Sequence, residues 1–222
     1  MATTIPTSPS VPNLPFELRQ AIESGECVLF IGAGVGGSLF DKNNTTLPNA
    51  AQLATEIAVF FGIDAEGSTD LAKISQVVEI RKRGRKELNA FLQKRFADIT
   101  PNDDVRWLST RPWRAIFTTN YDNGVERAYE LNPNTIQNPV VATVTADVGT
   151  INPMIEVPIY HLHGALFGVH DPHVIITEND YGTFQERRKM LFDLLKKELL
   201  TSTILYIGSL PSKLARSGLD RD

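Results

Sequence analysis

Cysteine is nearly absent from this sequence, and the absence limits the chemistry open to the chain. Cys27 is the single cysteine among 222 residues, which excludes an internal disulfide and a zinc site built from several thiolates. Long hydrophobic runs are missing as well, because none approaches the ~18 residues that a membrane-spanning helix requires. We therefore expect neither disulfide cross-links nor a membrane span.

An excess of basic residues is also lacking. The formal net charge of −4 provides no general attraction for nucleic acid or for an anionic membrane, so direct nucleic-acid binding is not expected. Hydrophobic residues make up 42% of the chain and charged residues 22%, which is ordinary for a globular protein with a substantial core. The length predicts one large domain, or one domain with a small cap.

The amino-terminal segment lacks the pattern of a targeting signal. It is rich in Thr, Ser and Pro and contains no basic region followed by an apolar stretch. We therefore expect residues 1–13 to form a flexible arm and the protein to be cytoplasmic.

Four short apolar runs of strand type each end in polar or glycine-rich residues. In open α/β sheets the carboxyl ends of parallel strands form the ligand crevice. The pattern predicts an α/β fold: a Rossmann-like, mostly parallel sheet with helices on both faces and one shared nucleotide site at the strand ends. The runs are 28–31, 115–117, 159–160 and 204–207, and they lead into 32–38, 118–122, 161–164 and 208–209.

Helical periodicity dominates the region between the first two of these strands. One predicted helix places Leu53, Ile57, Phe60 and Phe61 on one face. Together with two further helices it predicts a helical insertion over about 40–110 that caps the cleft. The further helices are expected over 70–81 and 86–96.

The carboxyl-terminal part is expected to contain another strand-type run and one long helix. Val174, Ile175 and Ile176 form the apolar run, and the helix is expected over 180–200. Residues 177–180 match a capping-box start for that helix. Upstream, the pattern predicts a helix over 123–131 and a strand over 140–144.

The first glycine loop satisfies the dinucleotide-binding fingerprint literally, with Gly32, Gly34 and Gly37 at the required spacing. Glycines allow positive φ angles and let backbone N–H groups approach a pyrophosphate. However, no helix, second strand and acidic residue follow at the usual distance. An ordinary Rossmann dehydrogenase is therefore not expected, and a tight turn without a ligand remains an alternative.

Five segments, taken in order, resemble motifs of the sirtuin superfamily, in particular the sirtuin-like NAD hydrolase domains of bacterial antiviral defence systems. The resemblance covers residues 14–210 and implies one NAD-binding catalytic domain, followed by a divergent tail at 211–222. The segments are 27–35, 118–122, 161–166, 176–181 and 205–210.

Departures from the deacetylase branch shift the expected chemistry toward NAD cleavage. Four zinc-binding cysteines are usual in that branch and cannot be supplied here, so no zinc is expected. Leu47 and Pro48 stand where a Phe-Arg pair is usual, and Tyr121 replaces an aliphatic residue. The resemblance therefore implies an NAD hydrolase that releases nicotinamide and ADP-ribose, with NAD as its substrate.

The resemblance also implies roles for particular residues. His163 would be the general base, Asn120 would orient the ribose hydroxyls or the attacking water, and Asp122 would hold the nicotinamide carboxamide or stabilise positive charge. The remaining expected contacts to NAD are Gly32, Ala33, Gly34, Ser38, Thr119, Gly208 and Ser209.

Ordinary structural roles remain open for several of these residues. Asn120 could be a turn or cap residue, and Asp122 could cap the helix that follows. His161 is interpreted as a packing or second-layer residue. His161-x-His163 with His170-x-x-His173 could imitate a metal cluster, although no carboxylate pattern accompanies it. The basic run 81–86 is interpreted as a solvated helix end.

Other functions and partners follow from the same resemblance. The alternatives are an NAD-dependent deacylase or ADP-ribosyltransferase, and a non-catalytic module that binds NAD or ADP-ribose. Because uncontrolled NAD cleavage would harm the host, we expect a homo-oligomer and a defence-system partner, which could be an ATPase, an Argonaute-like protein or a sensor. The activity would deplete NAD after infection.

Overall fold

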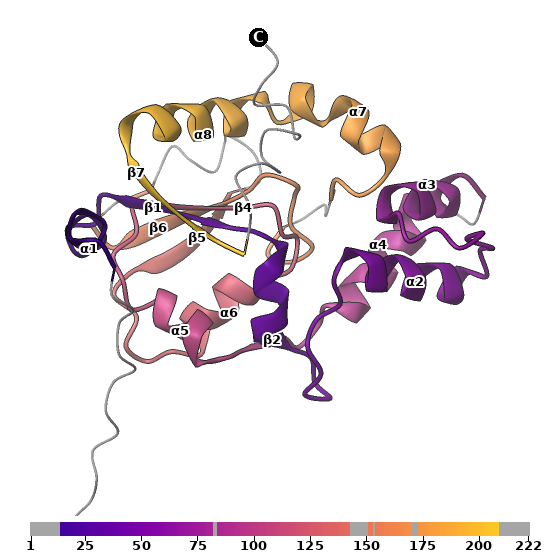
Figure 1. Cartoon of the computed structure of the whole chain (residues 1–222), viewed down its shortest axis with the longest axis horizontal. Helices are drawn as coiled ribbons and strands as arrows, with labels where there is room; N and C mark the ends of the chain where they lie inside the picture. The colour runs from indigo at the N-terminus through magenta and orange to yellow at the C-terminus, as the bar shows by residue number, and fades with distance from the viewer. Residues whose placement is uncertain (1–13, 82–83, 143–150, 153, 170–172, 209–222) are drawn as a thin grey trace, which may run out of the picture.

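The computed structural model describes residues 14–81, 84–142, 151–152, 154–169 and 173–208 (Figure 1). Strands and helices are mixed along the chain, with three consecutive helices after β2. In order, the elements are α1 (Phe16–Glu23), β1 (Cys27–Ile31), the 3-10 helix η1 (Ala33–Ser38), β2 (Leu39–Phe40), α2 (Ala50–Phe61), α3 (Leu71–Arg81), α4 (Arg85–Arg95), β3 (Thr100–Pro101), α5 (Asp103–Leu108), β4 (Ala115–Thr118), α6 (Gly124–Glu130), β5 (Asn138–Ala142), β6 (Glu156–His161), α7 (Glu178–Arg187), α8 (Lys189–Thr201) and β7 (Thr203–Ile207).

A five-stranded sheet forms the centre of the molecule, in the order β5-β6-β4-β1-β7. Every pairing within this sheet is parallel. The carboxyl ends of all its strands therefore lie along one edge. The predicted mostly parallel α/β sheet is confirmed.

Alternation along the strands places apolar side chains on both faces of the sheet. In β1, Leu29 and Ile31 belong to one buried cluster, whereas Val28 and Phe30 belong to the other. Successive side chains of a strand point to opposite faces, so both faces need a cover. Helices α5 and α6 cover the first face and α8 covers the second, as Figure 1 shows. The predicted helices on both faces are thus present.

Helices α2, α3 and α4 form a separate layer beyond the strand ends (Figure 1). Helix α2 begins at a capping box between Asn49 and Gln52, and it ends where Gly62 adopts a left-handed φ of 60°. Its buried side includes Leu53 and Ile57, as predicted. Phe60 was also predicted on that face but is 62% exposed, and its ring packs against the rings of Phe61 and Phe91.

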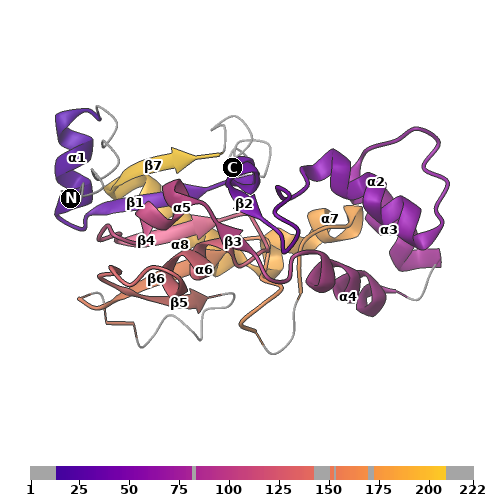
Figure 2. The same ribbon diagram turned by 90° about the horizontal axis from the view of Figure 1, so that it is seen from below.

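Three contacts connect this helical layer to the loops at the strand ends. Gln93 donates from Nε2 to the Leu166 carbonyl at 3.0 Å. The Phe96 ring packs edge-on against Tyr121 with ring centroids 5.9 Å apart. Figure 2 shows α7 reaching from the sheet toward the same layer, where Arg85 joins the two. The layer is therefore attached beside the predicted nucleotide site.

Arg85 forms the strongest of these connections. Its Nη2 lies 2.6 and 2.5 Å from the two carboxylate oxygens of Asp180, and its Nη1 donates to the Val174 carbonyl at 3.2 Å. Asp180 is 4% exposed, and despite burial the pKa of its carboxyl is lowered by Arg85 and by the N–H groups of Thr177 and Ile176. Arg85 is thus part of a partly buried ion pair, which corrects its interpretation as a solvated charge.

The start of α7 confirms the predicted capping box. Asp180 N–H donates to Thr177 Oγ1 at 3.2 Å, and Thr177 N–H donates back to Asp180 Oδ2 at 3.0 Å. The expected long helix is interrupted at Arg188 and forms α7 and α8 instead. The apolar run 174–176 is buried but pairs with no strand of the sheet, because the Asp180 carboxylate and the His163 carbonyl accept its N–H groups.

Two small features were not predicted from the sequence. Strands β2 and β3 form an antiparallel two-stranded sheet, and α5 follows directly after it. The α5 start is capped by Asn102, whose side chain accepts from Val105 N–H at 3.0 Å. Because α5 packs with α6 under the central sheet, the separate helical layer comprises α2 to α4 alone.

Some expectations concern residues outside the described ranges. These are the amino-terminal arm at 1–13, the tail at 211–222 and the end of the predicted strand at 143–144.

Across the ranges that the structure does describe, none of the helices combines the length and apolar character that crossing a bilayer demands.

Arg85→Met should destabilise the fold, because it leaves the Asp180 carboxylate buried without its guanidinium. We expect the free energy of unfolding at pH 7, measured by urea denaturation, to fall by about 3 kcal/mol. The pKa of Asp180 is lower in the folded state than in the unfolded state. The stabilisation that Arg85 contributes is therefore fully present above the unfolded-state pKa, and it is lost as pH falls through the folded-state pKa.

Lys189→Met is the matched control, since it breaks an ion pair to Asp193 whose side chains are 74% and 47% exposed. It should change the unfolding free energy by less than about 0.5 kcal/mol. Equal effects of the two substitutions would contradict the role assigned to Arg85.

Candidate functional site

The parallel register brings the ends of three neighbouring strands together. Ile31 of β1 pairs with Thr118 of β4, and Thr118 pairs with His161 of β6. Asn120 and His163 each follow the Thr118–His161 pair by two positions. The polar segments after β4 and β6 therefore leave the sheet side by side, at the edge expected for a ligand crevice.

Asn120 is held by backbone and side-chain contacts. Its N–H donates to Thr118 Oγ1 at 3.0 Å, and its side-chain Nδ2 donates to the Gly32 carbonyl at 3.3 Å. The second bond links the loop after β4 to the loop after β1. This bond directs the side-chain amide nitrogen of Asn120 to Gly32. Because the amide group is planar, the orientation of its Oδ1 is defined as well. Asn120 is more than a solvent-exposed turn residue.

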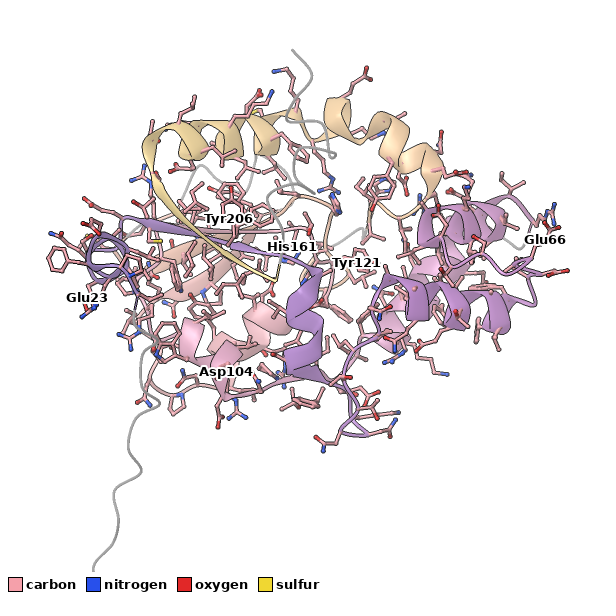
Figure 3. The ribbon with its side chains drawn as sticks, viewed as in Figure 1. Glu23, Glu66, Asp104, Tyr121, His161 and Tyr206 are labelled. Carbon is pink, nitrogen blue, oxygen red and sulfur yellow. The ribbon has the colours of Figure 1, made fainter. Side chains whose placement is uncertain are left out.

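His161 lies at the end of the sheet next to η1, as Figure 3 shows, and is 1% exposed. Its Nδ1 lies 2.9 Å from the Asn120 carbonyl oxygen, and its Nε2 lies 2.7 Å from Glu126 Oε1. Burial alone would lower the pKa of His161, but the Glu126 carboxylate and the two hydrogen bonds outweigh it and raise the pKa overall. Because a carbonyl only accepts, Nδ1 carries a proton.

His163 lies in the turn after β6 and is only partly accessible. Its carbonyl accepts from Ile175 N–H at 2.8 Å, and its ring meets Tyr181 of α7 edge-on at 5.7 Å between centroids. Burial, assisted by the positive charge of Arg188, lowers the pKa of His163 to about 4. The imidazole is therefore neutral at physiological pH and can accept a proton.

Arg188 supports the His163 turn from the junction of α7 and α8. Its Nη1 donates to the His161 carbonyl at 3.3 Å, and its Nη2 donates to the His173 carbonyl at 2.7 Å. Gly164 completes the turn with φ of 85°, where a Cβ would lie 2.1 Å from the His173 carbonyl oxygen. Only glycine fits there, since both the backbone angle and the space exclude a side chain.

Asp122 serves the start of α6. Its Oδ1 accepts from Gly124 N–H at 2.9 Å, a turn-type bond from the residue before the helix cap. The N-cap of α6 is Asn123, so Asp122 is not itself the N-cap that the sequence allowed. Burial raises the pKa of Asp122; the Gly124 N–H opposes this shift, and the nearby Glu126 carboxylate adds to it. Its second carboxylate oxygen, Oδ2, is a further acceptor that such a group can offer to a ligand.

The glycine loop after β1 is a short 3-10 helix, η1, in which Gly34 packs closely against the loop after β7. Gly32 N–H donates to the Ile207 carbonyl and Gly34 N–H to the Gly208 carbonyl, both at 2.9 Å. A Cβ on Gly34 would lie 2.8 Å from the Gly208 oxygen, and Gly208 has φ of 66°. The N–H groups of Gly32 and Gly34 are thus used within the protein instead of being directed at a pyrophosphate.

The other expected NAD contacts have different surroundings. Thr119 N–H donates to the Ile31 carbonyl at 3.4 Å, so Thr119 lies with the strand ends. Ser38 ends η1, and its carbonyl accepts from Asn102 N–H at 2.9 Å. Ala33 begins η1 and is exposed. Ser209 lies outside the described residues.

Within the described part of the chain, no group of three or more His, Cys, Asp or Glu side chains is arranged to hold a metal ion. His161 is engaged by Glu126, and His163 by its contact with Tyr181. His170 lies outside the described residues.

Glu126 and Arg188 were not identified by sequence reasoning. Glu126 lies in the first turn of α6, where an acidic residue is equally typical of a solvated helix start. Arg188 lies within a predicted helix without any distinguishing motif.

The second half of the chain matches a known protein family. Residues 114–210 match the family described as SIR2-like domain. This segment begins just before β4 and contains Asn120, Asp122, His161 and His163.

More specific likenesses extend over most of the chain. It is 30% identical to the NAD(+) hydrolase ThsA of Enterococcus faecium over 192 residues, which are 85% of this chain and 38% of that protein. It is 26% identical to the protein of the same name from Cytobacillus dafuensis (86% and 37% of the two chains) and 25% identical to that from Bacillus cereus strain MSX-D12 (86% and 38%). The predicted resemblance to sirtuin-like NAD hydrolase domains is confirmed. The match spans less than two fifths of the length of each relative.

Gly34→Ala should separate the loops after β1 and β7, because its Cβ would meet the Gly208 backbone at 2.8–2.9 Å. We expect the free energy of unfolding to fall by about 1–3 kcal/mol, measured by urea denaturation. Gly37→Ala is the control, since a Cβ there has nothing within 4 Å. The packing role assigned to Gly34 is wrong if both variants are equally stable.

Proposed function

We propose that this protein hydrolyses NAD at the bond between nicotinamide and ribose, releasing nicotinamide and ADP-ribose. The observation that carries the proposal is the placement of His163 and the firmly held Asn120 directly after the adjacent strands β6 and β4, in a chain aligned over 85% of its length with a protein named NAD(+) hydrolase.

The reaction places modest demands on acid catalysis. The bond between ribose C1′ and the pyridinium nitrogen breaks, and its electron pair stays on the nitrogen, so nicotinamide leaves as a neutral molecule. Water oxygen bonds to C1′ and releases one proton. The enzyme must therefore hold the ribose, stabilise an oxocarbenium-like transition state and accept the proton from water.

His163 is proposed as the base that accepts this proton. A general base must be unprotonated before the reaction, and the lowered pKa of His163 keeps it neutral. Arg188 contributes to that state by its charge and fixes the turn by its bonds to the His161 and His173 carbonyls. Tyr181 limits the rotation of the ring through its edge-on contact.

Asn120 and Asp122 are proposed to meet the ribose and the nicotinamide. With Nδ2 bound to Gly32, Asn120 Oδ1 is the acceptor for a ribose hydroxyl or the attacking water. Asp122 and Glu126 are carboxylates, and His161 compensates one of them. An ionised carboxylate at this position would favour the positive charge that develops on the sugar ring.

The remaining NAD contacts are proposed to follow η1 and the end of β7. Gly32, Ala33, Gly34, Ser38, Thr119, Gly208 and Ser209 would border the phosphate and ribose path. The N–H groups of Gly32 and Gly34 already donate hydrogen bonds within the protein. NAD would therefore contact this loop by van der Waals packing and through the side chains of neighbouring residues. The layer α2–α4, within the segment 40–110, is proposed to cap the cleft and exclude water.

A role in antiviral defence extends the proposal. The strand-end motifs resemble defence-system domains, in which NAD loss would halt an infected cell. We propose a cytoplasmic homo-oligomer that works with a partner subunit or domain. Product analysis separates this function from the alternatives, since a deacylase or ADP-ribosyltransferase would give an acyl-ADP-ribose or a modified protein, and a binding module would give no product.

His163→Ala and Asn120→Ala should each lower the rate of nicotinamide release from NAD. Loss of a general base typically costs ~10²–10⁴-fold, and we expect kcat to fall by that order for His163→Ala. Chromatography of nicotinamide and ADP-ribose measures the rate. His173→Ala is the control, because the side chain of His173 is 38% exposed and lies 3.8 Å from Asp180, while the carbonyl that accepts from Arg188 is kept in the variant. Undiminished turnover in both site variants would refute the assignment.

The pH dependence of kcat/KM should reflect the low pKa of His163. Protonation removes the base, so activity declines as pH falls through about 4 and stays constant between pH 5.5 and 7 on this account. An unperturbed histidine would already lose activity near pH 6.5. Circular dichroism at each pH separates this loss from acid unfolding, and an acidic limb centred near 6.5 would exclude His163 in its described environment.

A further inference from the structure

Glu126 and His161 form a buried polar pair beside the proposed site. Glu126 is 8% and His161 is 1% exposed, and 2.7 Å separates their nearest atoms. Burying a carboxylate and an imidazole is costly, and replacing such a pair by apolar residues is often neutral or stabilising. General stability therefore explains its presence poorly.

The second nitrogen of His161 indicates what the pair does. Nδ1 donates to the carbonyl of Asn120 at 2.9 Å. With Thr118 Oγ1 accepting from the N–H and the Gly32 carbonyl accepting from the side chain, Asn120 is held at three separate groups. The His161 bond is the one that holds the carbonyl oxygen of Asn120, and it thereby fixes the plane of the peptide bond between Asn120 and Tyr121.

The three elements involved come from different parts of the fold. His161 ends β6, Glu126 lies on α6, and Asn120 belongs to the loop that connects β4 to α6. Glu126 directs the imidazole ring, because a hydrogen bond at one nitrogen fixes the orientation of the other. A shift of α6 is thereby passed through the ring to Asn120.

We infer that His161, oriented by Glu126, is a positioning residue that holds Asn120 in its catalytic conformation. The inference rests on the proposed function and deepens it. His161 does not contact substrate, since it is enclosed beneath the loop. The other charged groups around it are Asp122, at the start of α6, and Arg188, which donates to the His161 carbonyl at 3.3 Å.

His161→Leu and His161→Asn form a matched pair of variants, because the two side chains have nearly the same shape. Asn can donate from the position of Nδ1 to the Asn120 carbonyl, whereas Leu cannot. Misplacing a reacting group by about 1 Å can cost ~10²-fold, so we expect kcat for NAD hydrolysis to fall roughly 10–100-fold in His161→Leu. In His161→Asn at least a tenth of wild-type kcat should return, with KM within about threefold in both.

Hydrogen exchange provides a measurement independent of activity. Peptides that cover 118–124 should exchange faster in His161→Leu, while peptides of β1 (Cys27–Ile31) keep their protection. If exchange rises equally in both regions, His161 has a general structural role and the inference is wrong. It is also wrong if His161→Leu retains wild-type kcat, or if His161→Asn is as impaired as His161→Leu.

Glu126→Gln extends the test if His161→Leu does not fold. The substitution keeps the shape and a hydrogen-bonding partner for Nε2 but removes the charge. The difference between a charged and a neutral hydrogen bond corresponds to roughly tenfold, so kcat should fall by about that factor with KM unchanged. Wild-type kcat in this variant would overturn the inference.

The outcomes distinguish this inference from the proposed function. If the wild-type chain releases nicotinamide and Asn120→Ala does not, the proposed function stands, and the His161 variants alone decide the positioning role. If the wild-type chain releases no nicotinamide from NAD, the proposed function fails, and the inference fails with it.

Discussion

In-register parallel pairing of β1, β4 and β6 is the constraint on which the rest of the structure depends. It places Ile31, Thr118 and His161 side by side, so the residues that follow them leave the sheet at the same edge. Antiparallel pairing of any of these strands would send its polar segment to the opposite edge. Strand direction therefore determines where the candidate site lies, and the individual side chains then determine its chemistry.

The loops at this edge are cross-linked mainly by backbone groups. Gly34 bonds to Gly208, Asn120 to Gly32, and Leu166 to the Tyr121 carbonyl. Such backbone contacts require the two loops to approach each other closely. This close approach explains the glycines at positions 34 and 208 better than phosphate binding does. A loop network of this kind would hold the proposed site residues in place before a ligand arrives, which is the condition for electrostatic preorganisation.

Polar groups buried beneath the loops complete the arrangement. The Arg85–Asp180 pair attaches the helical layer to α7, and His161 links α6 to the loop after β4. Both pairs lie between elements instead of within one. The first pair joins α4 to α7, and the second joins α6 to the end of β6.

Much of the fold and part of the site could be predicted from the sequence, because the patterns concerned are local. A continuous apolar run predicted β1, the spacing of Thr177 and Asp180 predicted the start of α7, and polar residues after strands predicted where the candidate site lies. Strand order and the partners of His161 were decided only by the tertiary structure. Glu126 lies 35 positions before His161, and Arg188 lies 27 positions after it. No local periodicity relates residues so far apart, and only the folded chain brings their charges together.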